Sequence, residues 1–292
     1  MAKEEKFTDI ITLDYAIADI TRALKESGFE TPGLDALLIV AHVLNWEKER
    51  VLAHRDEIFS EKQILMINES VTERLCGRPV AYITGKKEFY KNTFAVDERV
   101  LIPRGDTEIL VEEALRIAGG MKGDISILDL GTGSGAIGLS MACELKNATV
   151  VLSDISAEAL EVASQNAENL GLTGRVKLIE SDLFDGLCGL KFDMILTNPP
   201  YISSDGMNAL PPGIRQWEPY EALYGGSDGL SYYRSIFAHA PDYLNDGGII
   251  LAEIGEDQAV QVREIASGCG FNTIETLKDL AGLDRVISAK IG

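Results

Sequence analysis

From residue 124 onward, short apolar runs alternate with amphipathic stretches, and this alternation constrains the fold more than any other feature of the chain. The apolar runs predict strands, and the amphipathic stretches predict helices. Strands are expected at 125–130, 148–153, 175–180, 192–197, 247–253, 272–277 and 284–290, and helices at 136–146, 156–170, 228–244 and 256–268. Such repetition predicts an α/β domain with a mostly parallel sheet that helices cover on both faces.

The first 78 residues have a different pattern, which predicts a separate helical region. Thr12 is placed to cap a helix, and Pro32 follows a threonine at the first position of a second helix. Ser60 and Gln63 form a capping box at the start of a third. Short amphipathic helices with short joints predict a small helical bundle.

A connecting segment is expected at 79–105, between the helical domain at 1–78 and the α/β domain at 106–292. Within it, two stretches of aromatic and β-branched residues flank Lys91-Asn92. This arrangement predicts a β-hairpin. Further along, residues 202–227 are expected to form a long surface connection, and connections of this length are often functional.

The net charge of the chain indicates which classes of partner it can bind. It has 46 acidic and 27 basic residues, a formal net charge of −19. A nucleic-acid enzyme usually gains affinity from lysines and arginines on phosphates. The sequence contains no basic tract, so a protein or small-molecule substrate is expected, without direct binding of nucleic acid.

The chain also lacks the usual signals of a membrane protein, a secreted protein or a metalloprotein. No run approaches 18 apolar residues, and the opening MAKEEKFTD has no apolar core typical of a secretion signal. The cysteines and histidines are scattered, without metal-ligand spacing: Cys76, Cys143, Cys188 and Cys269, and His42, His54 and His239. We expect a reduced cytoplasmic protein without a metal or a disulfide framework.

A glycine-rich loop follows the first strand of the α/β domain and predicts a nucleotide-type cofactor. Its candidate binding residues are Gly131, Thr132, Gly133, Ser134 and Gly135. Glycines there allow a close backbone approach to a ligand at a helix N-terminus. The next strand ends at Asp154, which is placed to bind both ribose hydroxyls.

Two cofactors fit the loop taken alone. The spacing Gly133-x-Gly135-x-x-Gly138 satisfies the dinucleotide pattern, and S-adenosylmethionine also carries an adenosine. Asp129 is placed to pair with the ammonium of a methionine tail, and would be poorly placed beside a pyrophosphate. Asp182 is a candidate for the adenine amino group and Leu183 for the face of its ring.

The turn Asn198-Pro199-Pro200-Tyr201, at the end of the strand at 192–197, shifts the balance toward methyl transfer. Each proline fixes its own φ, and the first one biases Asn198 away from helical geometry. The adjacent carbonyls therefore point outward as acceptors. Together with the Asn198 side-chain oxygen they can hold both hydrogens of a planar NH₂ group, with the flat ring of Tyr201 beside it.

At this point the chain resembles the release factor glutamine methyltransferases, the HemK/PrmC family. The resemblance is carried by Arg78–Gly85, Leu101–Arg104, Asp106–Glu108, Asp129–Gly135, Asn198–Ile202, Glu218-Pro219, Gly226, Asp228–Leu230, Glu253–Gly255, Gln258 and Asp284-Arg285. It runs from about residue 14 to the C-terminus. Two positions depart from the family pattern: Gly105 replaces a second proline, and Leu183 stands where some members have tryptophan.

The resemblance implies a seven-stranded, Rossmann-like class I methyltransferase domain that uses S-adenosyl-L-methionine. A helical substrate-recognition domain and a hairpin linker precede it. The implied substrate is the Gly-Gly-Gln glutamine of class I peptide chain release factors, methylated on its amide nitrogen, N5. Asn198 and Pro199 are the expected catalytic residues, Pro200 and Tyr201 complete the substrate site, and Asn198 also borders the cofactor. A monomer is expected.

Three alternatives remain from the sequence. A sister enzyme methylates a glutamine of a ribosomal protein by the same chemistry. An adenine-N6 methyltransferase of DNA or RNA uses the same kind of turn, but the charge of −19 opposes it. A non-catalytic adaptor is disfavoured by the intact glycine loop and by Asn198.

Overall fold

The computed structural model describes residues 12–292, so the expectation for the opening residues lies outside the described part. Contacts between residues divide the chain into two units, which meet between Gly85 and Lys86. We describe each unit by itself. The functional boundaries expected at residues 78 and 105 stay a prediction, and the hairpin falls in the second unit.

The first unit is a helical bundle, as the sequence predicts. Its helices are α1 (Leu13–Glu26), α2 (Pro32–Leu44), α3 (Lys48–Ala53), α4 (Glu61–Leu75) and α5 (Val80–Thr84). The Thr12 side chain accepts a hydrogen bond from the Tyr15 amide and caps α1. Ser60 and Gln63 bond each other's backbone amides at the start of α4, which confirms the capping box. The apolar faces of α1, α2 and α4 form the core of this unit.

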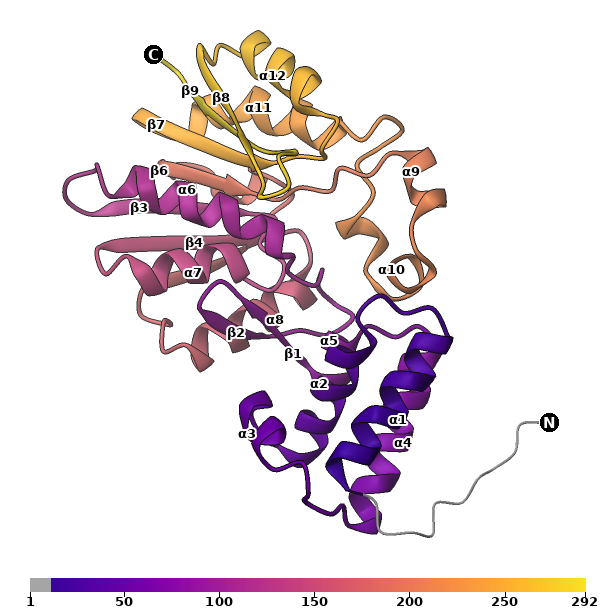
Figure 1. Cartoon of the computed structure of the whole chain (residues 1–292). Helices are drawn as coiled ribbons and strands as arrows, with labels where there is room; N and C mark the ends of the chain where they lie inside the picture. Colours follow the sequence, from indigo (N-terminus) through magenta and orange to yellow (C-terminus); the bar gives the residue numbers. More distant parts are fainter. Residues whose placement is uncertain (1–11) are drawn as a thin grey trace. The chain divides into compact units, whose positions relative to one another are not determined.

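The second unit contains the seven-stranded sheet that the sequence predicts (Figure 1). Its strands are β3 (Ile125–Leu130), β4 (Ala148–Asp154), β5 (Val176–Glu180), β6 (Phe192–Thr197), β7 (Leu244–Glu253), β8 (Thr273–Lys278) and β9 (Asp284–Lys290). The strand order is β5-β4-β3-β6-β7-β9-β8. The first five strands of this order are parallel, and β9 is antiparallel to both of its neighbours.

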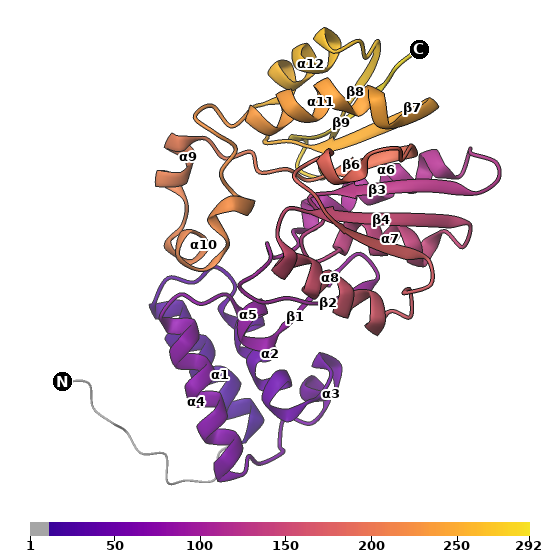
Figure 2. The same cartoon turned by 180° about the vertical axis from the view of Figure 1, so that it is seen from behind.

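Helices cover both faces of this sheet (Figures 1 and 2). They are α6 (Glu108–Ala118), α7 (Ala136–Glu144), α8 (Ala157–Asn169), α11 (Ser231–Tyr243) and α12 (Ala259–Gly268). Neighbouring residues of a strand point to opposite faces, so Ile127 packs with α6, α7 and α8, and Leu128 packs with α11 and α12. Because helices cover both faces of the sheet, the residues on both sides of each strand are buried, and the strand sequences are continuously apolar.

Several local features differ from the sequence prediction; α11 and α12, for example, begin three residues later than the helices expected at 228–244 and 256–268. The hairpin of β1 (Lys86–Phe89) and β2 (Asn92–Ala95) turns at Tyr90-Lys91, one residue earlier than expected, with Tyr90 at φ 52°. Strand β7 begins at Leu244 instead of residue 247, and an irregularity in its pairing with β6 accommodates the extra residues. The connection at 202–227 contains the short helices α9 (Ser204–Ala209) and α10 (Pro212–Trp217) and a 3₁₀ turn, η3 (Tyr220–Ala222).

Among the helices of residues 12–292, none combines the length and the apolarity that crossing a membrane requires. The same residues contain no group of three or more side chains arranged to hold a metal ion. All four cysteines are free thiols.

Candidate active site

The glycine loop joins β3 to α7 and forms an open cradle at the carboxyl edge of the sheet. Gly131 and Gly133 have φ values of 72° and 54°, which side-chain-bearing residues rarely adopt, and no atom lies within 4 Å of a Cβ built on either. Gly138 has no such room, because its Cβ would lie 2.4 Å from Leu152. The loop therefore leaves space for a ligand on one side and packs α7 tightly against the sheet on the other.

Two carboxylates hold this loop. Asp129 is fully buried, and its Oδ2 accepts hydrogen bonds from the Thr132 hydroxyl at 2.6 Å and the Gly138 amide at 2.8 Å. Its Oδ1 is buried without a partner among the described residues. Burial raises the pKa of Asp129 to about 6, against the lowering effect of these two bonds. Asp154 accepts from the Gly133 amide at 2.8 Å, and burial raises its pKa as well.

These positions fit the cofactor roles expected from the sequence. An ionised carboxylate offers about four lone-pair sites, so Asp154 can accept from the Gly133 and Ser156 amides and still accept from ribose hydroxyls. The unpartnered Asp129 Oδ1 is the kind of atom that a cationic group would satisfy. The ligand groups that these two carboxylates bind stay a prediction.

The turn after β5 carries the residues expected beside an adenine. Asp182 is exposed, and Leu183 is half-buried with φ 47°, in the left-handed region. The Ser181 hydroxyl holds this conformation by donating to the Leu183 carbonyl at 2.7 Å, and it accepts from the Gly186 amide. A leucine in this region costs about 1 to 3 kcal/mol, which marks the turn as a constrained feature of the site edge.

Asn198 follows β6 and lies between two neighbouring strand ends. Thr197 is in register with Leu130 of β3 and with Ala252 of β7, so the glycine loop and Glu253 flank Asn198. The Asn198 Nδ2 donates to the Thr107 hydroxyl at 3.3 Å. Thr107 closes a 3₁₀ turn, η1 (Gly105–Thr107), immediately before α6.

Glu253 is the buried acid of this edge, with only 1% of its surface exposed. Burial raises the pKa of its carboxyl to about 7, while hydrogen bonds from Thr107 and Asn198 and the charge of Arg285 lower it. Its Oε2 has no hydrogen-bond partner among the described residues. An ionisable group with a shifted pKa beside the proline turn is a candidate functional residue.

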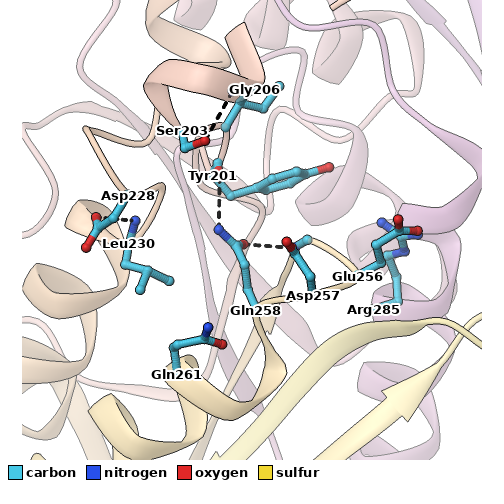
Figure 3. Close-up of a pocket in the computed structure, with 12 residues that line it drawn as sticks. Tyr201, Ser203, Gly206, Asp228, Leu230, Glu256, Asp257, Gln258, Gln261 and Arg285 are labelled. Atoms are coloured by element: carbon cyan, nitrogen blue, oxygen red, sulfur yellow. Dashed lines mark hydrogen bonds between the residues drawn. The ribbon is translucent and has the colours of Figure 1, made fainter. Parts of the chain in front are cut away.

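Hydrogen bonds to its backbone hold the proline turn in place (Figure 3). The Gln258 side chain donates to the Tyr201 carbonyl at 3.0 Å and to the Gly229 carbonyl at 3.2 Å, and it accepts from the Gly255 amide. Gly229 packs so closely that a Cβ there would lie 2.4 Å from the Tyr201 carbonyl oxygen. Pro199 is left with a carbonyl that no hydrogen bond within residues 12–292 uses.

A cavity of about 190 Å³ opens at this turn. Its polar lining comes from Asn198, Arg104 and Glu253, and Pro199 and Tyr201 form part of its wall. Apolar residues line the remainder: Leu101, Ile202, Leu210, Ile214, Ala222 and Leu223. A second cavity of about 410 Å³, shown in Figure 3, lies on the side of Tyr201 that faces Gln258. The smaller cavity has the mixed lining expected for an aliphatic chain that ends in an amide.

Ion pairs brace residues that line both cavities: Arg104 lines the smaller one and Arg285 the larger one. Glu218 is buried and pairs with Arg104, and it also accepts from the Ile102 amide at 3.2 Å. Arg285 pairs with Asp279 at 3.0 Å and lies 3.5 Å from Asp106. Arg104 and Asp106 therefore have a structural role near the site, and we assign neither of them a step in the chemistry.

Tyr201 is half-buried between the two cavities, and burial raises its pKa to about 12, with a further contribution from Glu253. Its phenol is therefore neutral at physiological pH, which suits a ring that packs against substrate and excludes a role as a general base.

The structure brings most of the expected residues to one edge, and it also gives contacts in the site to residues for which no site role was expected from the sequence. Thr107, Glu253 and Gln258 are three of them. A fourth is Asn166, a buried residue of α8 whose amide joins Ala95 of β2 to the Ser134 carbonyl in the glycine loop. The sequence did contain a signal for Glu253, because an acidic residue at the end of the apolar strand β7 is a candidate site residue.

Comparisons with known proteins agree with this geometry. Residues 16–85 match the PrmC N-terminal domain, and residues 106–209 match the methyltransferase small domain. The release factor glutamine methyltransferase of Geobacter sulfurreducens is 39% identical over 277 residues, which cover 94% of this chain and 96% of that protein. The protein of the same name from Moorella thermoacetica is 39% identical over 280 residues, which cover 96% and 98%.

A solved structure shares the fold. The methyltransferase from Pyrococcus furiosus is 18% identical, covers 80% of this chain and all of its own, and superposes with a TM-score of 0.50. The two relatives match nearly the full length of this chain at an identity that establishes a common family. The chain belongs to the release factor glutamine methyltransferase family.

Proposed function

We propose that this enzyme transfers a methyl group from S-adenosyl-L-methionine to the side-chain amide nitrogen of the glutamine in the Gly-Gly-Gln motif of class I peptide chain release factors. The observation that carries the proposal is the cavity of about 190 Å³, where Asn198 and Pro199 lie beside the glycine loop. Family membership supplies the substrate class. Nucleic acid, membrane, metal and a second copy of the chain have no part in this proposal.

The residues present fit the proposed cofactor. The glycine cradle has open space at Gly131 and Gly133, and the buried Asp129 Oδ1 lacks a partner among residues 12–292. We assign Asp129 to the cationic methionine end, Asp154 to the ribose, and Asp182 and Leu183 to the adenine. When bound, S-adenosylmethionine supplies a methyl group activated by a positively charged sulfur, and S-adenosylhomocysteine is the product.

An amide nitrogen is a weak nucleophile because its lone pair is delocalised into the carbonyl. The enzyme therefore needs to orient the nitrogen and to stabilise the positive charge that develops on it. The Asn198 side-chain oxygen and the Pro199 carbonyl can accept the two amide hydrogens and direct the lone pair toward the cradle. One of these two hydrogens leaves as a proton to water once the nitrogen carries the methyl group. Such positioning can contribute about 7 to 11 kcal/mol, and the two acceptors stabilise the developing charge.

The apolar lining of the cavity suits the aliphatic part of a glutamine side chain. Leu101 and Leu223 line the cavity together with Tyr201, whose ring offers a flat surface for packing. We assign recognition of the remaining release factor surface to the helical region at 1–78, which leaves the hairpin at 79–105 as its linker.

The test uses the purified enzyme, labelled S-adenosylmethionine and four acceptors: a class I release factor, the same factor with its Gly-Gly-Gln glutamine replaced by alanine, a ribosomal protein substrate and duplex DNA. The expected result is label in the intact release factor alone. Label in the ribosomal protein or DNA, with none in the release factor, would contradict the proposal.

A further inference from the structure

Three polar side chains meet behind the proline turn, and the chemistry outlined above leaves two of them unused. Asn198 follows β6, Thr107 closes η1 and Glu253 ends β7. The Asn198 Nδ2 donates to the Thr107 Oγ1 at 3.3 Å. The Glu253 carboxyl faces the Thr107 hydroxyl and the Asn198 amide, and both groups lower its pKa. Thr107 and Glu253 are buried.

The direction of these bonds decides which end of the Asn198 amide can face the cavity. An amide has an NH₂ end with two donors and an oxygen that only accepts. Thr107 and Glu253 supply acceptors for the NH₂ end. In the flipped orientation, the Asn198 oxygen would lie against the carboxylate and both donors would lose their partners. Because unmet buried donors are costly, the network favours one orientation.

We propose that Glu253 and Thr107 are positioning residues that hold the Asn198 amide with its oxygen directed at the substrate nitrogen. This role rests on the proposed function, since the orientation matters only if Asn198 accepts an amide hydrogen. Thr107 is outside the lining of the cavity and acts through Asn198, whereas Glu253 acts through Asn198 and also lines the cavity.

The charge of Glu253 determines whether the network holds. An ionised carboxylate only accepts hydrogen bonds, whereas a protonated one has an O–H that competes for the same partners. The groups facing Glu253 from neighbouring elements are Arg285 of β9, Asp106 of η1, Tyr201 after β6 and Tyr233 of α11, whose hydroxyl bonds the Glu253 carbonyl.

The pKa of Glu253, raised by burial to about 7, places its ionisation within the working pH range. Below that value the acid is protonated, the acceptor for Asn198 is weakened, and kcat falls. Above it the carboxylate is restored and kcat reaches a plateau. The structure therefore predicts that kcat rises near pH 7 as the Glu253 carboxyl ionises.

The experiment measures kcat and KM for release factor methylation from pH 5.5 to 9 in the full-length enzyme, together with the calorimetric affinity for S-adenosylmethionine. The test variants are Glu253→Gln, Thr107→Val and Thr107→Ser. Glu253→Gln and Thr107→Val are expected to lower kcat about tenfold or more with unchanged cofactor affinity. Thr107→Ser retains the hydroxyl and is expected to have a kcat close to that of the wild type. The step near pH 7 is expected in the wild type and in Thr107→Ser, and is lost in Glu253→Gln.

Two exposed residues provide matched controls. Glu264→Gln on α12 makes the same change of charge, and Thr149→Val on β4 makes the same loss of a hydroxyl. Both are expected to keep wild-type kcat and pH dependence. If Glu253→Gln fails to fold, Thr107→Val decides the question by its kcat.

The outcomes separate this role from the proposed function. If the wild type methylates the release factor and the folded variants match it in kcat and pH profile, the positioning role is overturned and the proposed function stands. If the wild type leaves the release factor unmethylated, the proposed function fails and this role fails with it.

Discussion

Asp129 shows how a single buried carboxylate can serve both the fold and the ligand. One oxygen binds the Thr132 hydroxyl and the Gly138 amide, which fixes the glycine loop, and the other is buried without a partner among the described residues. Burial raises its pKa to about 6, so the carboxyl changes its ionisation state at a pH only slightly below neutral. Binding of the methionine ammonium is expected to favour the ionised form.

Cofactor affinity is therefore expected to depend on pH through Asp129. As the pH falls below about 6, Asp129 takes up a proton and the calorimetric affinity for S-adenosylmethionine should fall by up to about tenfold per pH unit. Asp129→Asn should bind more weakly and lose this dependence, whereas Glu253→Gln should retain it. A wild-type affinity that is constant between pH 5 and 7 would exclude the ammonium pairing.

Part of the site could be predicted at this scale. Asn198, Pro199, Asp129 and Asp154 follow strand ends or the glycine loop, and such positions are visible in the sequence. The partners of these residues were not visible. Thr107 is 91 residues from Asn198 in the chain, and only the fold brings the two together.

The element that shapes the site most is the proline turn, which neighbouring turns hold in place. Gln258 binds its Tyr201 carbonyl, and Gly225 and Gly229 approach its backbone so closely that a Cβ at either would lie under 3 Å from it. These glycines are needed for close approach, and Gly229 also has φ 76°. The position of the turn therefore depends on segments that follow it in the chain.

Two glycine substitutions separate backbone strain from this close approach. Gly229→Ala places a Cβ 2.4 Å from the Tyr201 oxygen, whereas Gly247→Ala, at φ 74°, meets nothing within 4 Å. Gly247→Ala should lose about 1 to 2 kcal/mol of stability from the left-handed conformation, measured by denaturant unfolding, and Gly229→Ala should lose more because its Cβ also meets the turn. Gly229→Ala alone should also lower kcat about tenfold or more, because the turn is displaced. Equal kcat values in the two variants would show that the turn tolerates the displacement.

At the level of elements, strand existence was easier to predict than strand ends. The apolar strands β3 and β6 have the expected bounds, because uninterrupted hydrophobic runs define them. Strand β7 starts earlier because Leu244 pairs with Phe192 of β6, while Asn245 to Gly248, which resemble a turn locally, lie in the irregularity of that pairing. The helices at 204–217 were missed since their short lengths leave little periodicity to detect.

For the whole molecule, the net charge of −19 bears on substrate choice. A polyanion is repelled at long range by such a protein, and the repulsion is strongest at low salt. Duplex DNA added in excess at low ionic strength is therefore expected to leave the rate of release factor methylation unchanged. Inhibition that salt relieves would reveal a local basic surface and would reopen the nucleic-acid alternative.

The helical unit is the part assigned to recognition, and its surface carries exposed apolar side chains. On α4, Leu65 is 64% exposed and Met66 is 38% exposed. Replacing both with serine should raise KM for the intact release factor, because burial of such side chains contributes about 1.5 to 3 kcal/mol each. Steady-state kinetics should show unchanged kcat and cofactor affinity. An unchanged KM would place recognition elsewhere.

The central claim is that Asn198 holds the substrate amide for methyl transfer, and the most direct measurement is kcat for Asn198→Ala beside its affinity for S-adenosylmethionine. We predict a loss of about 100-fold or more in kcat, as when a preorganised hydrogen-bonding group is removed from an active site, with cofactor affinity largely intact. Near-normal turnover on the release factor would contradict the account.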